Sequence, residues 1–233
     1  MICDPCTRRS SIRCQSVTGL QSDLAVSALQ PETQKRASSD QTQANSGVLI
    51  RPVEPSELEE VAWLRAEAYY EDQPHLRYVG SFKRQFKEQE ARSLKERTRC
   101  RPGNERPECV CFVAVEEAGS SGVMGTLDAE PPGSTTAQHR RIPEGTTYVL
   151  NVVVSKKHRK RGIGRALMAA AGKLAKEQWG SDSMCTHVSA QNEAALALYT
   201  LCGFQESSQE GFLQESAVGG SLLGKQLFMM APL

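Results

Sequence analysis

The feature that most constrains the fold is a basic, glycine-containing turn between an apolar segment and a long amphipathic segment. The apolar segment runs from Val149 to Val154, and the turn reads H-R-K-R-G-I-G-R from His158 to Arg165. Glycines let an anion approach the backbone closely, and a helix N-terminus offers unpaired N–H groups with a partial positive charge. A strand, this turn and a helix therefore predict a site for a phosphate or diphosphate group.

Length and composition limit the class of protein. The chain has 233 residues, of which 39% are hydrophobic and 24% charged, and its net charge is +1. That is enough for one core of ordinary size. No stretch approaches the roughly 20 apolar residues of a membrane span, and the basic residues at 156–161 are explained by a phosphate ligand. We therefore expect one domain of catalytic size, with no membrane span and no nucleic-acid partner.

The eight cysteines do not have the spacing of a metal or disulfide framework. Cys3 and Cys6 form one C-x-x-C pair, but no second pair follows at the spacing of a zinc site. Cys109 and Cys111 are two apart in a predicted strand, where they share a face but are poorly placed to form a bond with each other. We expect reduced cysteines that pack as small hydrophobic residues, and no metal.

Residues 1 to about 46 differ in composition from the rest of the chain. Serine, threonine and glutamine are frequent, aromatic residues are absent, and Arg8, Arg9 and Arg13 outnumber acidic residues in the first twenty positions. The continuous apolar run of a secretory signal is absent. This composition predicts a disordered organelle transit peptide, plastid rather than mitochondrial, and Ile12-Arg13-Cys14 resembles a plastid processing site. A disordered cytosolic tail of the same composition is the alternative.

From residue 47 onward the hydrophobic pattern is that of a globular domain, which we expect to cover 47–233. Alternating or continuous apolar runs predict strands, and apolar residues at three- and four-residue spacing predict helices. Antiparallel strands come first, then strand–helix–strand–helix, then a final strand, which implies a mixed sheet with helices on both faces. The predicted strands are Val48–Val53, Val110–Val115, Val123–Asp128, Thr147–Val154, Met184–Ala190 and Leu227–Met230; the predicted helices are Ser56–Tyr69 with Ser56 as its cap, Phe82–Arg97, Ile163–Trp179 and Glu193–Cys202.

Two common phosphate-binding turns do not match this sequence. A P-loop needs G-x-x-x-x-G-K-[ST], and no Lys-Ser or Lys-Thr pair follows the second glycine, Gly164. A dinucleotide-binding fold needs G-x-G-x-x-G, and the third glycine is missing here. The residues instead read R-x-x-G-x-G at Arg159, Gly162 and Gly164, preceded by an apolar strand and followed by a long helix.

With this turn the chain resembles the GCN5-related N-acetyltransferases (GNAT) over nearly all of residues 47–233. A second signature of that family, N-x-x-A-x-x-x-Y-x-x-x-G-F, matches Asn192 to Phe204. Two motifs in the right order and separation are far more specific than either one. The resemblance implies an α/β (α+β) fold with a mixed, mostly antiparallel central sheet of about six or seven strands and helices on both faces.

The resemblance also implies acetyl-CoA as the co-substrate. In this family the backbone amides of the turn take the pyrophosphate, and a strand that splays from its neighbour bonds the pantetheine arm. The simpler alternatives are a basic helix start without a ligand, a plain helix N-cap for Asn192 and a core aromatic for Tyr199. The residues that would contact acetyl-CoA are Val152, Val153, Val154, Arg159, Lys160, Arg161, Gly162, Ile163, Gly164, Arg165, Asn192 and Tyr199.

Acetyl transfer needs a neutral amine, a polarised carbonyl and a proton for the departing thiolate. By resemblance, Tyr199 lies near the CoA sulfur and acts as general acid, and backbone N–H groups around Val153 and Val154 stabilise the developing oxyanion. His158, in a position that is often aromatic in relatives, is expected only to pack.

The general base is less constrained, because the family uses no fixed residue for it. Certain protein N-terminal acetyltransferases of the family use a tyrosine and a histidine around an ordered water. Their offsets from the two motifs land on Tyr148 and His187 in this chain. Ordinary packing of two strand residues remains the alternative for that pair. The alternative bases are Glu116, Glu117 and Asp128.

The resemblance favours protein N-terminal α-amines or lysine ε-amines as the acceptor. In this family the first helix, the loop after it and the final hairpin wall the acceptor site, so Tyr69, Tyr70, His75 and Tyr78 would line its entrance. A small arylalkylamine such as serotonin is the second candidate acceptor. A non-catalytic module that binds acyl-CoA is a hypothesis of another class, which would need neither Tyr199 nor a base.

Overall fold

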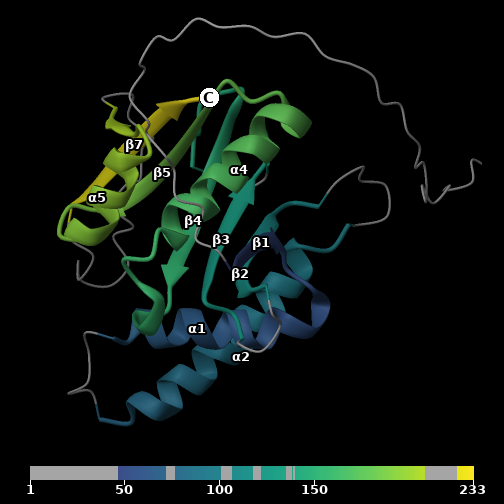
Figure 1. Ribbon diagram of the computed structural model, residues 1–233, viewed down its shortest axis with the longest axis vertical. Coiled ribbons are helices and arrows are strands. Elements are labelled where there is room, and N and C mark those ends of the chain that lie inside the picture. Colours follow the sequence, from purple (N-terminus) through teal and green to yellow (C-terminus); the bar gives the residue numbers. More distant parts are fainter. Residues whose placement is uncertain are drawn as a thin grey trace, which may run out of the picture. The chain divides into compact units, whose positions relative to one another are not determined.

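The computed structural model describes residues 47–71, 77–100, 107–117, 122–134, 138, 140–207 and 225–233 (Figure 1). Within this part of the chain, a seven-stranded sheet has the order β1-β2-β3-β4-β5-β7-β6. Strands β4 and β5 are parallel, and every other neighbouring pair is antiparallel. The strands are β1 (Val48–Pro52), β2 (Val110–Glu116), β3 (Gly125–Glu130), β4 (Thr146–Val154), β5 (Ser183–Ser189), β6 (Gln205–Glu206) and β7 (Gln226–Pro232).

Different helices cover the two faces of the sheet. On β2, Phe112 and Ala114 pack with residues of α4, whereas Cys111 and Val113 pack with residues of α1 and α2. Because side chains alternate along a strand, these are opposite faces. The predicted α/β fold, with a mixed and mostly antiparallel sheet between helices, is confirmed. The helices are α1 (Leu58–Tyr69), α2 (Val79–Arg97), α4 (Ile163–Trp179) and α5 (Glu193–Leu201), with 3-10 turns η1 (Pro55–Glu57) and η2 (Lys156–His158).

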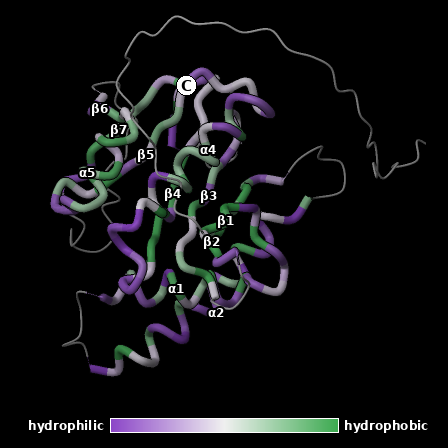
Figure 2. The backbone as a smooth tube through the Cα atoms, in the orientation of Figure 1, coloured by the Kyte–Doolittle hydropathy of each residue, from purple (hydrophilic) through white to green (hydrophobic). Residues whose placement is uncertain are grey.

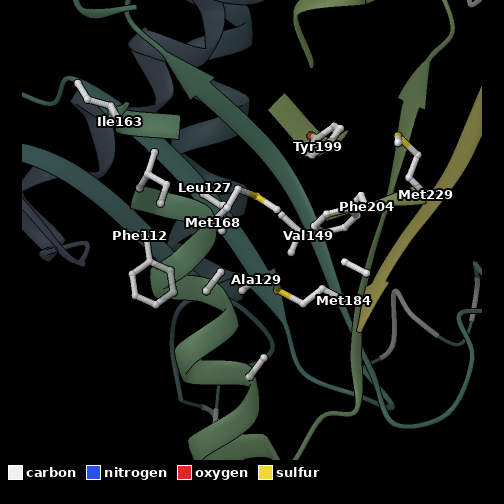
Figure 3. Packing of buried hydrophobic residues seen from close by; sticks show 14 of the residues in the cluster. Phe112, Leu127, Ala129, Val149, Ile163, Met168, Met184, Tyr199, Phe204 and Met229 are labelled. Atoms are coloured by element: carbon white, nitrogen blue, oxygen red, sulfur yellow. The ribbon is translucent and has the colours of Figure 1, made fainter. Parts of the chain in front are cut away.

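The largest core cluster lies between the sheet and the helices α4 and α5. Figure 3 shows that side chains from five strands (β2, β3, β4, β5 and β7) and two helices (α4 and α5) meet there. Hydrophobic residues also dominate the central strands in Figure 2, whereas α2 is largely hydrophilic. The members of the core cluster that Figure 3 labels are Phe112, Leu127, Ala129, Val149, Ile163, Met168, Met184, Tyr199, Phe204 and Met229.

The start of the first helix differs from its prediction. A 3-10 turn, η1, precedes α1, and the carboxylate of Glu57, not Ser56, accepts a hydrogen bond from the backbone N–H of Glu54 at 2.8 Å. Arg51 holds the same carboxylate through two bonds of 2.8 Å. Pro55 favours this tight turn because its ring presets φ. The prediction of Ser56 as the helix cap is therefore wrong.

Several other boundaries shift by a few residues. Helix α2 begins at Val79, three residues before the predicted Phe82, and β7 extends to Pro232. The short strand β6 carries no pattern that could have predicted it, because it has only two exposed residues. His75 lies outside the described residues, and so does most of the segment 118–122, which joins the predicted strands Val110–Val115 and Val123–Asp128.

The described cysteines are all free, and most are shielded from solvent. Cys109, Cys111 and Cys185 are buried, Cys202 is half-buried and Cys100 is exposed. In the part of the chain that the structure covers, no group of three or more His, Cys, Asp or Glu residues could hold a metal ion. None of the helices in that part is both long and apolar enough to cross a membrane.

Candidate active site

The sheet opens between its two parallel strands. Strands β4 and β5 pair from Thr146–Ser183 to Tyr148–Cys185. Beyond that pair, β4 continues to Val154 and β5 to Ser189 without pairing to each other among the residues described. Backbone groups of a strand that has lost its neighbour need another partner. The opening therefore offers main-chain hydrogen bonds to a ligand.

A bulge in β4 causes the strand to diverge. Its register against β3 shifts between the Asp128–Leu150 and Thr126–Val153 pairs, so that two residues of β4 face one residue of β3. Asn151, one of the two, has a φ of 54°, in the left-handed region. Asparagine tolerates this conformation better than most residues, and a bulge bends and twists the strand that carries it.

A buried ionic network holds the bulge. The Asn151 amide donates to the Asp128 carboxylate at 2.9 Å, and Arg65 binds both oxygens of that carboxylate at 2.6 and 2.9 Å. Arg97 adds a bond of 3.1 Å. Burial by itself would raise the pKa of Asp128, but Arg65, Arg97 and Asn151 together hold it below its usual value. Asp128 therefore serves as a fixed anion in the structure and is unsuited to act as a base.

The other two alternative bases, Glu116 and Glu117, lie at the β1 edge of the sheet. Glu116 ends β2 opposite Val48 of β1, and Glu117 follows it, with its N–H bonded to the Gly47 carbonyl at 2.9 Å. Both residues line a depression at the β1 edge of the sheet together with Arg51. Strands β2 and β3 separate this edge from β4, so neither residue borders the opening.

The direction of the β4 backbone shows which amides face the opening. The Ser155 N–H bonds to Met124 on the β3 side, and the Val153 carbonyl also lies on that side, next to Gly125. The N–H and C=O groups of alternate strand residues point the same way. The N–H groups of Val152 and Val154 therefore point into the opening, whereas that of Val153 points towards β3.

The basic turn leads directly into the N-terminus of α4. Gly162 is the N-cap with a φ of 77°, Lys160 has a φ of 61°, and the first intrahelical bond runs from Ala166 N to Gly162 O at 3.0 Å. The preceding amides, of residues 163–165, consequently have no partner within the helix. Exposed Lys160, Arg161 and Arg165 surround them. These donors and charges fit a diphosphate.

The side chain of Arg159 has a partner of its own. Its guanidinium bonds to both carboxylate oxygens of Glu71, just after α1, and its Nε donates to the Val154 carbonyl at 3.2 Å. Lys156 also approaches Glu71, at 3.4 Å. Arg159 and Lys156 hold the pKa of Glu71 below its usual value, against the effect of burial. Arg159 thus links the end of β4 to the end of α1.

Tyr199 lies buried on the α4/α5 side of the sheet. Its ring centroid is 5.6 Å from that of Phe204. Burial raises the pKa of Tyr199, and a hydrogen bond with Thr186 of β5 partly offsets the rise. A phenol with a raised pKa stays protonated at neutral pH, as a proton donor must.

Tyr148 and His187 meet on the opposite side of the sheet. The His187 Nδ1 lies 3.2 Å from the Tyr148 hydroxyl, and Arg140 donates to the same hydroxyl at 2.9 Å. Tyr148 is buried, which raises its pKa to about 12 despite the opposing effect of Arg140. The structure thus brings together the two residues that the motif offsets selected.

Neighbouring residues of β5 connect the two sides. Thr186 contacts Tyr199, and His187 contacts Tyr148. Because successive strand residues point to opposite faces, Tyr199 and the Tyr148–His187 pair lie on either side of the sheet. Tyr199 also raises the pKa of Tyr148.

Asn192 caps a helix, and the aromatic residues at the end of α1 pack against each other and against α2. The Asn192 Oδ1 accepts from Ala195 N at 3.1 Å and caps α5, as the simpler alternative expected. Tyr69 is exposed, and Tyr78 is more so. The rings of Tyr69 and Tyr70 contact one another and form a cluster with Phe82 and Phe86 of α2.

Comparison with known proteins decides the family. The model of the acetyltransferase (GNAT) family matches residues 58–204. The chain belongs to this family. Two curated GNAT relatives are the chloroplastic GCN5-related N-acetyltransferases 6 and 7 of Arabidopsis thaliana. The first is 31% identical over 166 residues, or 62% of this chain and 56% of the relative. The second is 28% identical over 189 residues, which cover 70% of this chain and 69% of the relative. The chain thus spans little more than half of the first relative.

Solved GNAT structures share the fold. A chimera of spermidine N-acetyltransferase SpeG from Vibrio cholerae and hSSAT has a TM-score of 0.52 at 20% identity, covering 80% of this chain and 96% of that chain. The PaiA N-acetyltransferase of Thermoplasma acidophilum, solved in complex with coenzyme A, has a TM-score of 0.52 at 17% identity. The match covers 80% of this chain and 99% of that chain.

Sequence reasoning missed four residues that shape this GNAT site: Arg65, Arg140, Asn151 and Glu71. Arg65 interrupts the apolar stripe of α1, and a charged residue in a buried stripe signals a buried partner. Arg140, Asn151 and Glu71 lie in a loop, a bulge and a helix end, where no periodic pattern distinguishes them.

Proposed function

We propose that this GNAT protein transfers the acetyl group of acetyl-CoA to primary amines of proteins, at N-terminal α-amines, lysine ε-amines or both. One observation carries the proposal. The opening between β4 and β5 has a buried phenol, Tyr199, on one side and a hydrogen-bonded Tyr148–His187 pair on the other. Direct transfer of an acetyl group requires a proton donor near the sulfur and a proton acceptor near the amine.

The proposed donor site consists of backbone more than of side chains. The free amides at the start of α4 would hold the pyrophosphate, with Lys160, Arg161 and Arg165 close to the phosphates. The N–H groups of Val152 and Val154 would bond the pantetheine arm or the acetyl carbonyl. The expected contribution of the Val153 N–H is dropped, because that group points towards β3. Arg159 would contribute through its backbone, since Glu71 occupies its side chain.

The proposed proton transfers use the two sides of the opening separately. Tyr199 would give its proton to the departing thiolate. Tyr148 and His187 would take a proton from the acceptor amine, directly or through one water, so that a neutral amine attacks. Acetyl-CoA supplies the activated acetyl group when bound. Asn192 would act by capping α5, the helix that carries Tyr199.

A small arylalkylamine is the second candidate acceptor. It is favoured by the aromatic cluster of Tyr69, Tyr70, Phe82 and Phe86, in which Tyr69 and Phe82 remain substantially exposed. Aromatic rings prefer to stack on other rings.

The test is an unbiased acceptor screen. The protein is incubated with acetyl-CoA and a mixed library of peptides and small amines, and acetylated products are identified by mass spectrometry. We expect acetylation of peptide α-amines or lysines. Products from arylalkylamines alone would overturn the protein-substrate proposal. Binding of acetyl-CoA without any acetylated product would point instead to a non-catalytic acyl-CoA-binding module.

We further propose that residues 1–46 are a transit peptide, that 47–233 form the acetyltransferase domain, and that the mature protein works in the plastid stroma. The composition of that segment and the chloroplastic names of the two Arabidopsis relatives support the location. A fluorescent protein fused behind residues 1–46 should enter plastids of plant cells. Its accumulation in mitochondria or cytosol would contradict the proposal.

A further inference from the structure

The hydroxyl of Tyr148 has a second partner that the proposed function does not use. Arg140, in the segment before β4, donates from Nη1 to the Tyr148 oxygen at 2.9 Å. The carbon at the centre of its guanidinium lies 5.0 Å from the centre of the Tyr148 ring. The arginine therefore contacts both the oxygen and the face of the phenol, and its orientation is fixed by two kinds of interaction.

This contact determines the direction of one hydrogen bond at Tyr148 and favours a direction for the other. An arginine has only donors, so the phenol oxygen must accept from Arg140. The single phenolic hydrogen then remains to donate, and the His187 Nδ1 at 3.2 Å is an acceptor within reach. His187 would accordingly be the neutral tautomer with its hydrogen on Nε2.

We infer that Arg140 is a positioning residue for the general base, which orients Tyr148 so that a proton passes from the acceptor amine through the phenol to His187. This inference rests on the proposed function. In the step, the ammonium group of the acceptor gives one proton to the Tyr148 oxygen. The phenolic hydrogen moves to the His187 Nδ1. The amine becomes neutral, Tyr148 is again a phenol, His187 becomes an imidazolium, and Arg140 keeps its charge.

The charges around the phenol support this assignment. Burial and the neighbouring Cys185, Glu130 and Tyr199 all raise the pKa of Tyr148, and Arg140 is the group that lowers it. Arg140 is thus the only one of these influences that eases transient loss of the phenolic proton. The ring of Phe228 covers His187 from β7, with the centroids 4.9 Å apart, and contributes no charge.

The test compares Arg140→Ala, Arg140→Lys and a remote surface variant, Arg84→Ala, in the full chain with a peptide acceptor found by the screen. We expect Arg140→Ala to lower kcat at least about tenfold, because a hydrogen bond to a charged group is lost. The KM for acetyl-CoA should stay unchanged. The acidic limb of the kcat profile should move to higher pH, because loss of a cation beside the hydrogen-bonded Tyr148–His187 pair favours protonation of that pair.

Chemical rescue distinguishes positioning from a merely structural role. Added guanidinium ion at millimolar concentration should restore part of the activity of Arg140→Ala, and should not stimulate Tyr148→Phe or Arg84→Ala. Arg140→Lys keeps the positive charge, so the acidic limb of its kcat profile should lie at the same pH as in the wild-type protein. This variant also serves if the alanine variant does not fold.

Two results would overturn the inference. One is an Arg140→Ala variant with wild-type kcat and pH profile. The other is a loss of activity that guanidinium does not restore and that Arg140→Lys shares without a shift of the acidic limb. Failure of the proposed function gives a different result, because the wild-type protein itself would then acetylate no amine in the screen.

Discussion

Asp128 is a buried carboxylate whose contacts point to a structural role. It is fully buried, and Arg65, Arg97 and Asn151 all donate to it. Buried ion pairs add little net stability compared with apolar packing, but removal of one partner costs about 3–5 kcal/mol because the other charge stays buried. The network is therefore better explained by the geometry that it imposes on β4.

The depressed pKa of Asp128 predicts how stability depends on pH. A carboxylate whose folded pKa lies below its unfolded value contributes stability above the unfolded pKa, near 4, and loses it as pH falls through the folded value. In urea denaturation, we expect the contribution of Asp128 to the free energy of unfolding to stay constant from neutral pH to about 4 and to fall steeply below that pH. Asp128→Asn should be less stable at pH 7 and lack this acidic component. Equal stability of the variant at pH 7 would contradict the account.

Tyr199 allows a second prediction at this scale. Tyr199→Phe removes only the hydroxyl, so acetyl-CoA should bind with nearly unchanged affinity, while kcat falls by about 100-fold or more, as expected for loss of a general acid. Steady-state kinetics and calorimetric titration with acetyl-CoA measure the two quantities. An unchanged kcat would exclude Tyr199 as the acid, and equal losses in binding and kcat would assign it to donor binding.

At the scale of elements, the β4 bulge converts a continuous sheet into an open site. Asn151 combines a positive φ with the bond to Asp128, so backbone conformation and side-chain contact can be separated by substitution. Asn151→Gly keeps the conformation and loses the bond. Asn151→Ala loses both, and the left-handed backbone adds about 1–2 kcal/mol of strain.

We therefore expect a graded effect on the donor site. Asn151→Gly should raise the KM for acetyl-CoA moderately, and Asn151→Ala should raise it further, because the amides of Val152 and Val154 lose their orientation. Acceptor KM should change less. The same KM for acetyl-CoA in all three proteins would show that the bulge does not depend on Asn151.

At the scale of the whole molecule, the proposed function places the donor and the acceptor on opposite faces of the sheet. Tyr199 packs in the cluster that includes α4, and Tyr148 packs with Cys185 and Phe228 on the other face. Direct transfer through the opening needs both substrates bound together. The buried thiol nearest Tyr148, Cys185, is a poor nucleophile because burial raises its pKa to about 12.

This arrangement predicts sequential kinetics. Double-reciprocal plots at several acceptor concentrations should intersect, and intact-mass spectrometry should find no acetylated enzyme in the presence of acetyl-CoA alone. Cys185→Ala should retain transfer activity. Parallel plots with an acetylated Cys185 would instead demonstrate a covalent intermediate.

The parts that could be predicted from sequence have a local physical basis. The strand–turn–helix around Gly162 follows from apolar periodicity and glycine, whereas the Tyr148–His187 pair was expected only from the resemblance to GNAT relatives. The Asn151 bulge, the role of Arg140 and the cap at Glu57 could not be predicted. The bulge depends on Asp128, which lies 23 residues from Asn151 in the chain. Arg140 and Glu57 have partners only eight and six residues away, but no periodic pattern marks these contacts.

The sequence by itself determined the family, the order of the elements and the position of the anion-binding turn, because hydrophobic period and glycine placement act over a few neighbouring residues. Only the tertiary structure decided which amides face the opening, which acid is committed to a buried ion network and which arginine touches the phenol. Those properties arise when side chains lose water and meet specific partners across the sheet, and pairing of that kind leaves no periodic trace in the chain.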